Sequence, residues 1–180
     1  VASYVLQIST HQCMLPSGVI LDLRYTGNCG REAVWASSVS HQAQSRNTNS
    51  LVSGITSQVS GPCTQEILYE MTTGSIGDAA SGCAWQAGNR SAGGRYLNHT
   101  TPLEQKFAAE VLKSSAWMKR SDANEIVKAL IPKYEEKLRN PLKGKSFTEC
   151  YDIKTLTPIK EWQEIYDRVW KELEDLGLPR

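Results

Sequence analysis

The sequence lacks an excess of charge of either sign. Twenty Lys and Arg residues stand against nineteen Asp and Glu residues, which gives a net charge of +1. A protein whose main partner is nucleic acid or an anionic membrane needs a concentrated basic surface. No apolar run is long enough to cross a membrane, and the first residues lack the order of a signal peptide. We therefore expect a soluble, cytoplasmic protein that binds neither nucleic acid nor membrane.

The sequence also lacks paired cysteines. Its five cysteines are odd in number and include no CxxC pair: Cys13, Cys29, Cys63, Cys83 and Cys150. This argues against both a zinc cage and a disulfide framework and favours buried, reduced thiols. The histidines share no ligand spacing either: His11, His41 and His99. We expect each to be a surface or a hydrogen-bonded core residue, and we expect no bound metal.

Local catalytic motifs are missing as well. The chain contains no GxSxG, HExxH, GxxxxGK[ST] or GxGxxG sequence. Any chemistry must therefore be assembled from residues that lie far apart in the sequence.

Residues 1–100 are rich in Gly, Ser, Thr and Ala, and they show strand, loop and helix signals in succession. Gly18–Tyr25 has the composition of a strand, and 31–45 has the length of a helix. The pattern repeats with a strand within Ser50–Ser60 and a helix over 64–76, where Pro62 suits a first helical turn. Such a succession predicts a parallel α/β sheet.

Residues 101–180 carry most of the Lys and Glu residues and predict three helices. Thr101–Glu104 has the form of a capping box, and the helix after it has an apolar stripe. A second helix should begin near Ser121 and kink at Pro132. A third should run from Thr157 to Gly177. The segment between the last two contains four apolar residues that we expect to pack against the core: Phe147, Tyr151, Ile153 and Leu156.

Candidate site residues follow the two predicted strands, because the carboxyl ends of parallel strands in an α/β barrel face one mouth. Arg24 lies at the end of the first strand and could clamp an anion, although an ion pair with Asp22 on the same strand face inside the barrel explains both residues equally well. Gln58 follows the second strand and could orient a polar ligand, or it could be an idle loop residue. Cys63 stands at a predicted helix start that favours a thiolate, or it is simply a small packed residue.

Two long stretches resemble a known family. "GKSFTECYDIKTLTP" (144–158) and "YDRVWKELEDLGL" (166–178) closely resemble the C-terminal segment of the monomethylamine methyltransferases of methylotrophic methanogens. Shorter matches are "SGPCTQ" (60–65), "DAASG" (78–82), Arg24, and Arg31 with Glu32.

The resemblance implies a fold. The family has a (β/α)8 TIM barrel with additional helices and assembles into homo-oligomers. The chain would then be the C-terminal part of such a barrel, with late βα units in 1–100 and the closing helices with their packed connector in 101–180.

The resemblance also implies a reaction. The family transfers a methyl group from monomethylamine to the Co(I) form of a corrinoid (cobalamin) that a partner protein carries. A pyrrolysine residue captures the amine, and it would lie upstream of Val1 together with an acidic residue. The present chain would bind no cofactor directly.

One departure from the family pattern lies within the chain. Family members have a glutamine and a tyrosine shortly before the Gly-Pro-Cys motif, where this sequence has Ile55 and Ser57 at unshifted spacing. Only a local shift would let Gln58 take the place of that glutamine. The alternative is a non-catalytic homologue that serves assembly or partner binding, or a paralogue that acts on another methylated amine.

Overall fold

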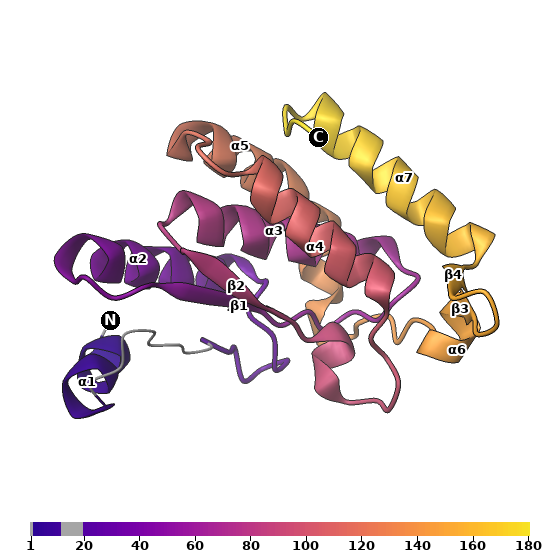
Figure 1. Cartoon of the computed structure of the whole chain (residues 1–180), viewed down its shortest axis with the longest axis horizontal. Helices are drawn as coiled ribbons and strands as arrows, with labels where there is room; N and C mark the ends of the chain where they lie inside the picture. Colours follow the sequence, from indigo (N-terminus) through magenta and orange to yellow (C-terminus); the bar gives the residue numbers. More distant parts are fainter. Residues whose placement is uncertain (1, 12–19) are drawn as a thin grey trace.

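The structure, a computed structural model, describes residues 2–11 and 20–180 (Figure 1). Cys13 and the predicted strand's first residues, Gly18 and Val19, lie outside these ranges, and so does the side chain of His11. The first half contains α1 (Ala2–His11), α2 (Arg31–Asn47), β1 (Ser53–Thr56), α3 (Gln65–Ala80), β2 (Trp85–Asn89) and the short 3-10 helix η1 (Ser91–Gly94). The second half contains α4 (Pro102–Ser114), α5 (Arg120–Leu130), η2 (Ile131–Lys133), η3 (Glu135–Arg139), α6 (Phe147–Cys150), β3 (Tyr151–Asp152), β4 (Thr157–Pro158) and α7 (Lys160–Asp175).

The first predicted strand is wrong in its described part, where the chain forms a tight turn over 22–27. The Asp22 amide donates to the Gly27 carbonyl (2.8 Å), and the Asp22 carbonyl accepts from the Thr26 amide (2.7 Å). The Asp22 carboxylate also accepts from the Arg24 amide (2.9 Å). An aspartate that binds the backbone two residues further on offers the chain a turn in place of a strand ladder.

A parallel pair of strands does exist, but its second member was not predicted. β1 occupies the centre of the predicted Ser50–Ser60 strand and pairs in parallel with β2. β2 lies in the small-residue stretch 79–94, whose composition is typical of turns. Gly88 has φ +106° where the register shifts by one residue, which marks a bulge. The mixed α/β character expected from the sequence is confirmed.

α3 is the central element of the molecule. It contacts both parallel strands as well as α2, α4, α5 and α7 (Figure 1). Eleven of its sixteen residues are buried, and these include polar ones such as Glu70 and Thr72. A helix that is surrounded on most sides has little need of a single apolar stripe. Its buried residues accordingly include both large apolar and small polar side chains.

The three predicted helices of the second half are confirmed. The capping box of Thr101 and Glu104 begins α4. Pro132 lies just after the end of α5, where the chain continues as η2 and η3. Gly177 has φ +94°, and the Leu178 amide donates to the Leu173 carbonyl (2.9 Å), which ends α7 in a Schellman motif.

The segment between η3 and α7 packs only in part as expected. Phe147 is partly buried and stacks on the buried Tyr151, with ring centroids 5.2 Å apart. Ile153 and Leu156 are 50% and 67% exposed at the tip of the β3–β4 hairpin, so their predicted packing is wrong. The hairpin reverses the chain through the Asp152 side chain, which turns both residues outward.

Residues 142–145 run against the loop that follows β1. The Gly61 amide donates to the Leu142 carbonyl, and the Lys145 amide donates to the Pro62 carbonyl, each at 2.9 Å. A Cβ atom on Gly61 would lie 1.7 Å from the Lys143 carbonyl oxygen. Only glycine allows such a close approach of two backbones.

Within residues 2–11 and 20–180, no helix is both long enough and apolar enough to span a membrane.

Candidate functional site at the carboxyl ends of the parallel strands

A partly buried cluster of amide and hydroxyl side chains lies where β1 and β2 end. Asn89, the last residue of β2, accepts from Gln58 Nε2 (3.3 Å) and from the Thr56 hydroxyl. The Asn89 amide donates to Gln105 Oε1 on α4 (3.3 Å). Parallel strands present their carboxyl ends at the same edge, so residues 31 apart in sequence meet here.

Two atoms of this polar cluster lack hydrogen-bond partners among the described residues. They are Gln58 Oε1, which is an acceptor, and Gln105 Nε2, which is a donor. Gln58 is fully buried. A buried polar atom without a partner is costly, so both atoms are suited to bind a polar ligand or a further part of the protein.

A buried glutamate fixes the loop that follows β1. Glu70 of α3 accepts from the amides of Val59 (2.7 Å) and Ser60 (3.2 Å). Burial raises the pKa of Glu70 to about 7, although these hydrogen bonds oppose the shift.

A second buried glutamate fixes the loop that follows β2. Glu104 of α4 accepts from the Ser91 hydroxyl (3.0 Å) and from the Thr101 amide (2.5 Å). Burial raises the pKa of Glu104 to about 7 as well, against the same kind of opposition from hydrogen bonds. Each loop at this edge is therefore held by one carboxyl group.

The turn over 22–27 lies beside the same edge. Asn28 donates to the Ile55 carbonyl and accepts from the Ser57 amide, each at 2.7 Å, which ties this turn to the end of β1. Arg90 Nη2 donates to the Thr26 carbonyl (3.0 Å), and Arg95 Nη2 donates to the Tyr25 carbonyl (3.3 Å). The two arginines place positive charge at the rim of the polar cluster.

Arg24 projects from the exposed side of this turn. Its guanidinium pairs with Asp22 and with Glu32 in the first turn of α2, and its side chain is 53% exposed. The Arg24 hydrogen bonds lower the pKa of Asp22 to about 2. The predicted Asp22–Arg24 pair is thus confirmed, but it lies on a surface turn rather than on a strand inside a barrel. The anion clamp stays a prediction.

Cys63 does not have the environment of a thiolate. It precedes Thr64, the N-cap of α3, and has φ +64°. Burial raises the pKa of its thiol. The prediction that Pro62 lies in the first helical turn is wrong, because α3 begins only at Gln65. Cys63 is a small packed residue, and it is unbridged like the other described cysteines: Cys29, Cys83 and Cys150.

The described histidines are hydrogen-bonded and buried, in line with one of the two expectations. His99 Nδ1 lies 3.0 Å from the Leu97 carbonyl. His41 Nδ1 lies 3.3 Å from Asp78 Oδ1 and 3.2 Å from Cys83 Sγ. This last grouping depends on the tertiary fold, because its three members come from α2, α3 and the turn before β2.

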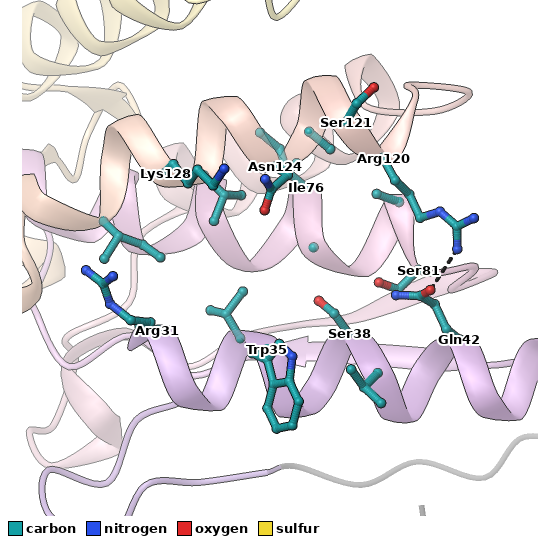
Figure 2. Close-up of a pocket in the computed structure, with 17 residues that line it drawn as sticks. Arg31, Trp35, Ser38, Gln42, Ile76, Ser81, Arg120, Ser121, Asn124 and Lys128 are labelled. Atoms are coloured by element: carbon teal, nitrogen blue, oxygen red, sulfur yellow. Dashed lines mark hydrogen bonds between the residues drawn. The ribbon is translucent and has the colours of Figure 1, made fainter.

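A separate hollow of about 660 Å³ lies between α2, α3 and α5 (Figure 2). Its walls are largely apolar, and its charged residues already have partners. Arg120 reaches across to Gln42 (2.7 Å), and Arg31 binds Glu135 (2.8 Å). Among the described residues that line this hollow, no buried side-chain polar atom lacks a hydrogen-bond partner. The hollow is therefore a weaker candidate for a ligand site than the strand edge.

Comparison with known proteins identifies the family. The family model for the monomethylamine methyltransferase MtmB matches residues 1–178. The chain belongs to this family. The region matched is the C-terminal portion of the MtmB proteins.

Curated MtmB proteins show the same relationship at the sequence level. The monomethylamine methyltransferase MtmB of Methanosarcina mazei is 43% identical over 118 residues, which cover 66% of this chain and 26% of the relative. MtmB1 of Methanosarcina acetivorans is 42% identical over the same length and coverage.

Solved MtmB structures extend the relationship to the fold. The crystal structure of Methanosarcina barkeri MtmB matches with a TM-score of 0.92 at 32% identity. A structure described as the hydroxylamine MtmB complex matches equally well. Each match covers 99% of this chain and 39% of the solved chain. This MtmB family chain therefore spans well under half the length of its relatives.

Several residues of the candidate site were missed in the sequence. Asn89 lies in a stretch without a clear strand pattern, and Gln105 and Glu70 lie in helices whose apolar residues dominate the signal. Glu104 carried a usable signal, since its capping box with Thr101 was recognised. Its further bond to Ser91 depends on the tertiary fold.

Proposed function

We propose that this chain is the C-terminal part of an enzyme that transfers the methyl group of monomethylamine to the Co(I) corrinoid of a partner protein. The proposal includes a (β/α)8 barrel with additional helices, a pyrrolysine residue upstream of Val1, homo-oligomeric assembly and a cytoplasmic location. The chain itself would bind no cofactor, because the corrinoid is presented by the partner. Support comes from membership of the MtmB family and from the fold.

The observation that carries the proposal is the polar cluster at the carboxyl ends of β1 and β2, in which Gln58 is fully buried. Barrel enzymes place their active sites at this end of the strands. Gln58 Oε1 is a buried acceptor without a partner among the described residues. It suits the N–H groups of a methylammonium ion, or of the adduct that the amine forms with an electrophile.

The supporting residues have positioning roles in this proposal. Asn89 orients Gln58, while Glu70 and Glu104 hold the two loops. Arg24 remains a candidate anion clamp at the outer rim, with Asp22 and Glu32 as its present partners.

The activity test uses the full-length protein with a corrinoid protein reduced to Co(I). We expect methyl-cobalt to form only when monomethylamine is present. The change in corrinoid absorbance measures its formation. Dimethylamine and trimethylamine serve as parallel substrates. Absence of a methyl-cobalt signal with all three amines would contradict the proposed methyltransferase activity.

The role of the polar cluster is tested by Gln58→Ala. We expect kcat/KM for the amine to fall by roughly 10- to 100-fold, because a buried acceptor for the substrate is removed. Gln163→Ala is the matched control, since Gln163 lies on α7 and its partly exposed side chain donates to Asp167 Oδ1 (3.0 Å), away from the polar cluster. Equal activity of the two variants would remove Gln58 from the site.

A second candidate is a paralogue specific for another methylated amine. At unshifted spacing, Ile55 and Ser57 stand where the resemblance implies a glutamine and a tyrosine. Gly54 and Thr56 pack against Asp78 and Gly74 of α3, so Ile55, which lies between them, faces the opposite side of β1. A preference for dimethylamine or trimethylamine in the assay above would favour this candidate.

A further inference from the structure

We propose that His41, Asp78 and Cys83 form a zinc-binding site. The site lies at the amino-terminal ends of β1 and β2, opposite to the candidate functional site. Cys83 is two residues before β2, and the neighbouring Ala84 amide donates to the Val52 carbonyl just before β1 (2.8 Å). Nothing in the proposed methyl transfer uses these residues.

The spacing of the three side chains fits one tetrahedral ion. Their ligand atoms all lie within 4.8 Å of one another. His41 Nδ1 is 3.3 Å from Asp78 Oδ1 and 3.2 Å from Cys83 Sγ. Ordinary zinc bond lengths in a tetrahedron place nitrogen about 3.3 Å from oxygen and about 3.5 Å from sulfur. The two separations from His41 therefore already match a zinc tetrahedron to within a few tenths of an ångström.

The arrangement does not suit a Cys-His-Asp catalytic relay. Such a relay places the nucleophile at one ring nitrogen and the carboxylate at the other. Here Asp78 and Cys83 both approach Nδ1 of His41. Three different donor atoms thus form one compact group, as metal ligands do.

Outer contacts hold the Asp78 carboxylate in a ligating orientation. Gln86 Nε2 donates to Asp78 Oδ2 (3.0 Å), which leaves Oδ1 directed toward His41. Ser75 in turn donates to Gln86 Oε1 (3.2 Å). A Cβ atom on Gly54 would lie 2.0 Å from Asp78 Oδ2, so the adjacent strand leaves space only for the carboxylate. Oriented outer contacts of this kind are typical of metal ligands.

The turn after α3 brings Cys83 back to the helix end. The amides of Ser81 and Cys83 both donate to the Asp78 carbonyl, at 3.2 and 3.1 Å. Gly82 has φ +88°, which the reversal requires. Asp78 and Cys83 are thereby fixed on the same side of α3, facing His41 of α2.

Charge balance also favours a cation at this position. Asp78 is 5% exposed and lies in the last turn of α3, where the helix dipole is unfavourable for an acid and no basic residue is present. A zinc ion with one carboxylate, one thiolate and one neutral imidazole has no net charge. Binding releases the thiol proton of Cys83 to solvent as the zinc–sulfur bond forms, so one proton leaves for each ion bound.

We assign the fourth position of the tetrahedron to a water molecule. Cys83 is only partly buried, whereas His41 is 3% exposed. Because the site joins α2, the end of α3 and the start of β2, we assign the metal a structural role.

The test is a metal measurement on the full-length protein. The protein is stripped with a chelator, re-equilibrated with Zn²⁺, separated from free metal and analysed by mass spectrometry. We expect the wild type to hold one more zinc per chain than Cys83→Ser, and to release one proton as that zinc binds. Cobalt substitution should give thiolate-to-cobalt charge-transfer absorption in the wild type and lose it in Cys83→Ser.

Cys63→Ser is the matched control, because Cys63 is also a free cysteine but lies at the other end of α3. It should keep both the zinc and the cobalt signal. Cys83→Ser preserves the size of the side chain, and Asp78→Asn provides a second variant if folding is impaired. Equal zinc content in the wild type and Cys83→Ser, with no cobalt–thiolate band, would overturn the proposal and leave a hydrogen-bonded trio.

Discussion

Two buried carboxyl groups, Glu70 and Glu104, hold the loops of the candidate site at the strand edge. Glu70 and Glu104 each satisfy backbone or hydroxyl donors of a loop, yet burial raises the pKa of both to about 7. The two loops of the candidate site are therefore held by groups that titrate near neutrality.

These pKa values predict a pH-dependent stability. Between about pH 4.5 and about pH 7 the folded protein binds more protons than the unfolded chain, so the free energy of unfolding falls as pH rises. The loss amounts to up to about 3 kcal/mol for each group. Urea unfolding at pH 5 and pH 7.5 should show it, and Glu104→Gln should reduce the difference. An unchanged difference in that variant would contradict the assignment.

The Tyr134 hydroxyl provides a second prediction for a single residue. Tyr134 is 1% exposed and donates to the Cys29 carbonyl (2.5 Å). Tyr134→Phe should lower the free energy of unfolding by about 1–3 kcal/mol, because a buried carbonyl loses its donor. Tyr69→Phe is the control, since Tyr69 bonds Glu172, which keeps Lys133 as a partner. If urea unfolding shows equal losses of unfolding free energy in the two variants, the hydrogen bond to the Cys29 carbonyl contributes no more than the one to Glu172.

At the scale of elements, the contact between Gly61 and residues 142–145 joins the loop after β1 to the segment before α7. Gly61→Ala should lower the free energy of unfolding by about 3 kcal/mol or more, because the new Cβ would overlap the Lys143 carbonyl. Gly177→Ala has open space around the new Cβ but keeps φ +94°. It should cost only about 1 kcal/mol. Thermal unfolding compares the stability of the two variants. A smaller loss of stability in Gly61→Ala than in Gly177→Ala would show that the two backbones can separate.

The elements also show where the sequence was informative. Capping boxes, proline and glycine signals and apolar stripes located α4, α5 and α7, because these helices bury one face against α3. β2 escaped notice, since a short strand of small and polar residues has no apolar alternation. The Asp22–Gly27 turn replaced a predicted strand because side-chain hydrogen bonds of Asp22 decided the local backbone. The turn signal of Asp22 is local and visible in the sequence, but the apolar and β-branched composition of 18–25 favoured a strand prediction.

The site was accessible only in outline. Gln58 could be located near a strand end from the sequence, and the structure places it in the polar cluster with Asn89. Its partners on β2 and α4 could not be found, because they depend on a parallel pairing that the sequence did not reveal. The same reason hid the grouping of His41 with Asp78 and Cys83.

At the scale of the whole molecule, the parallel sheet is small for the number of helices around it. β1 and β2 pair only with each other among the described residues. Parallel sheets are normally covered on both faces and are longer than two strands. Exposed apolar side chains such as Leu23, Leu97 and Trp117 add to the uncovered surface, at 85%, 87% and 101% exposure.

This geometry predicts that the 180-residue chain associates when it is produced alone. Unpaired strand edges and exposed apolar side chains favour contacts between copies. Light scattering at increasing concentration should show growing mass, whereas the full-length protein should keep a fixed mass. A chain that stays monomeric across that range would contradict the expectation.

The connection between residues 142–145 and the loop after β1 bears on how the chain can change length during evolution. Insertions at the tip of the β3–β4 hairpin extend into solvent, since Ile153 and Leu156 are already exposed there. An insertion a dozen residues earlier would push Gly144 away from Pro62 and carry the disturbance into the loop that bears Gln58. An inserted residue should therefore be tolerated better at the hairpin tip than within 142–145.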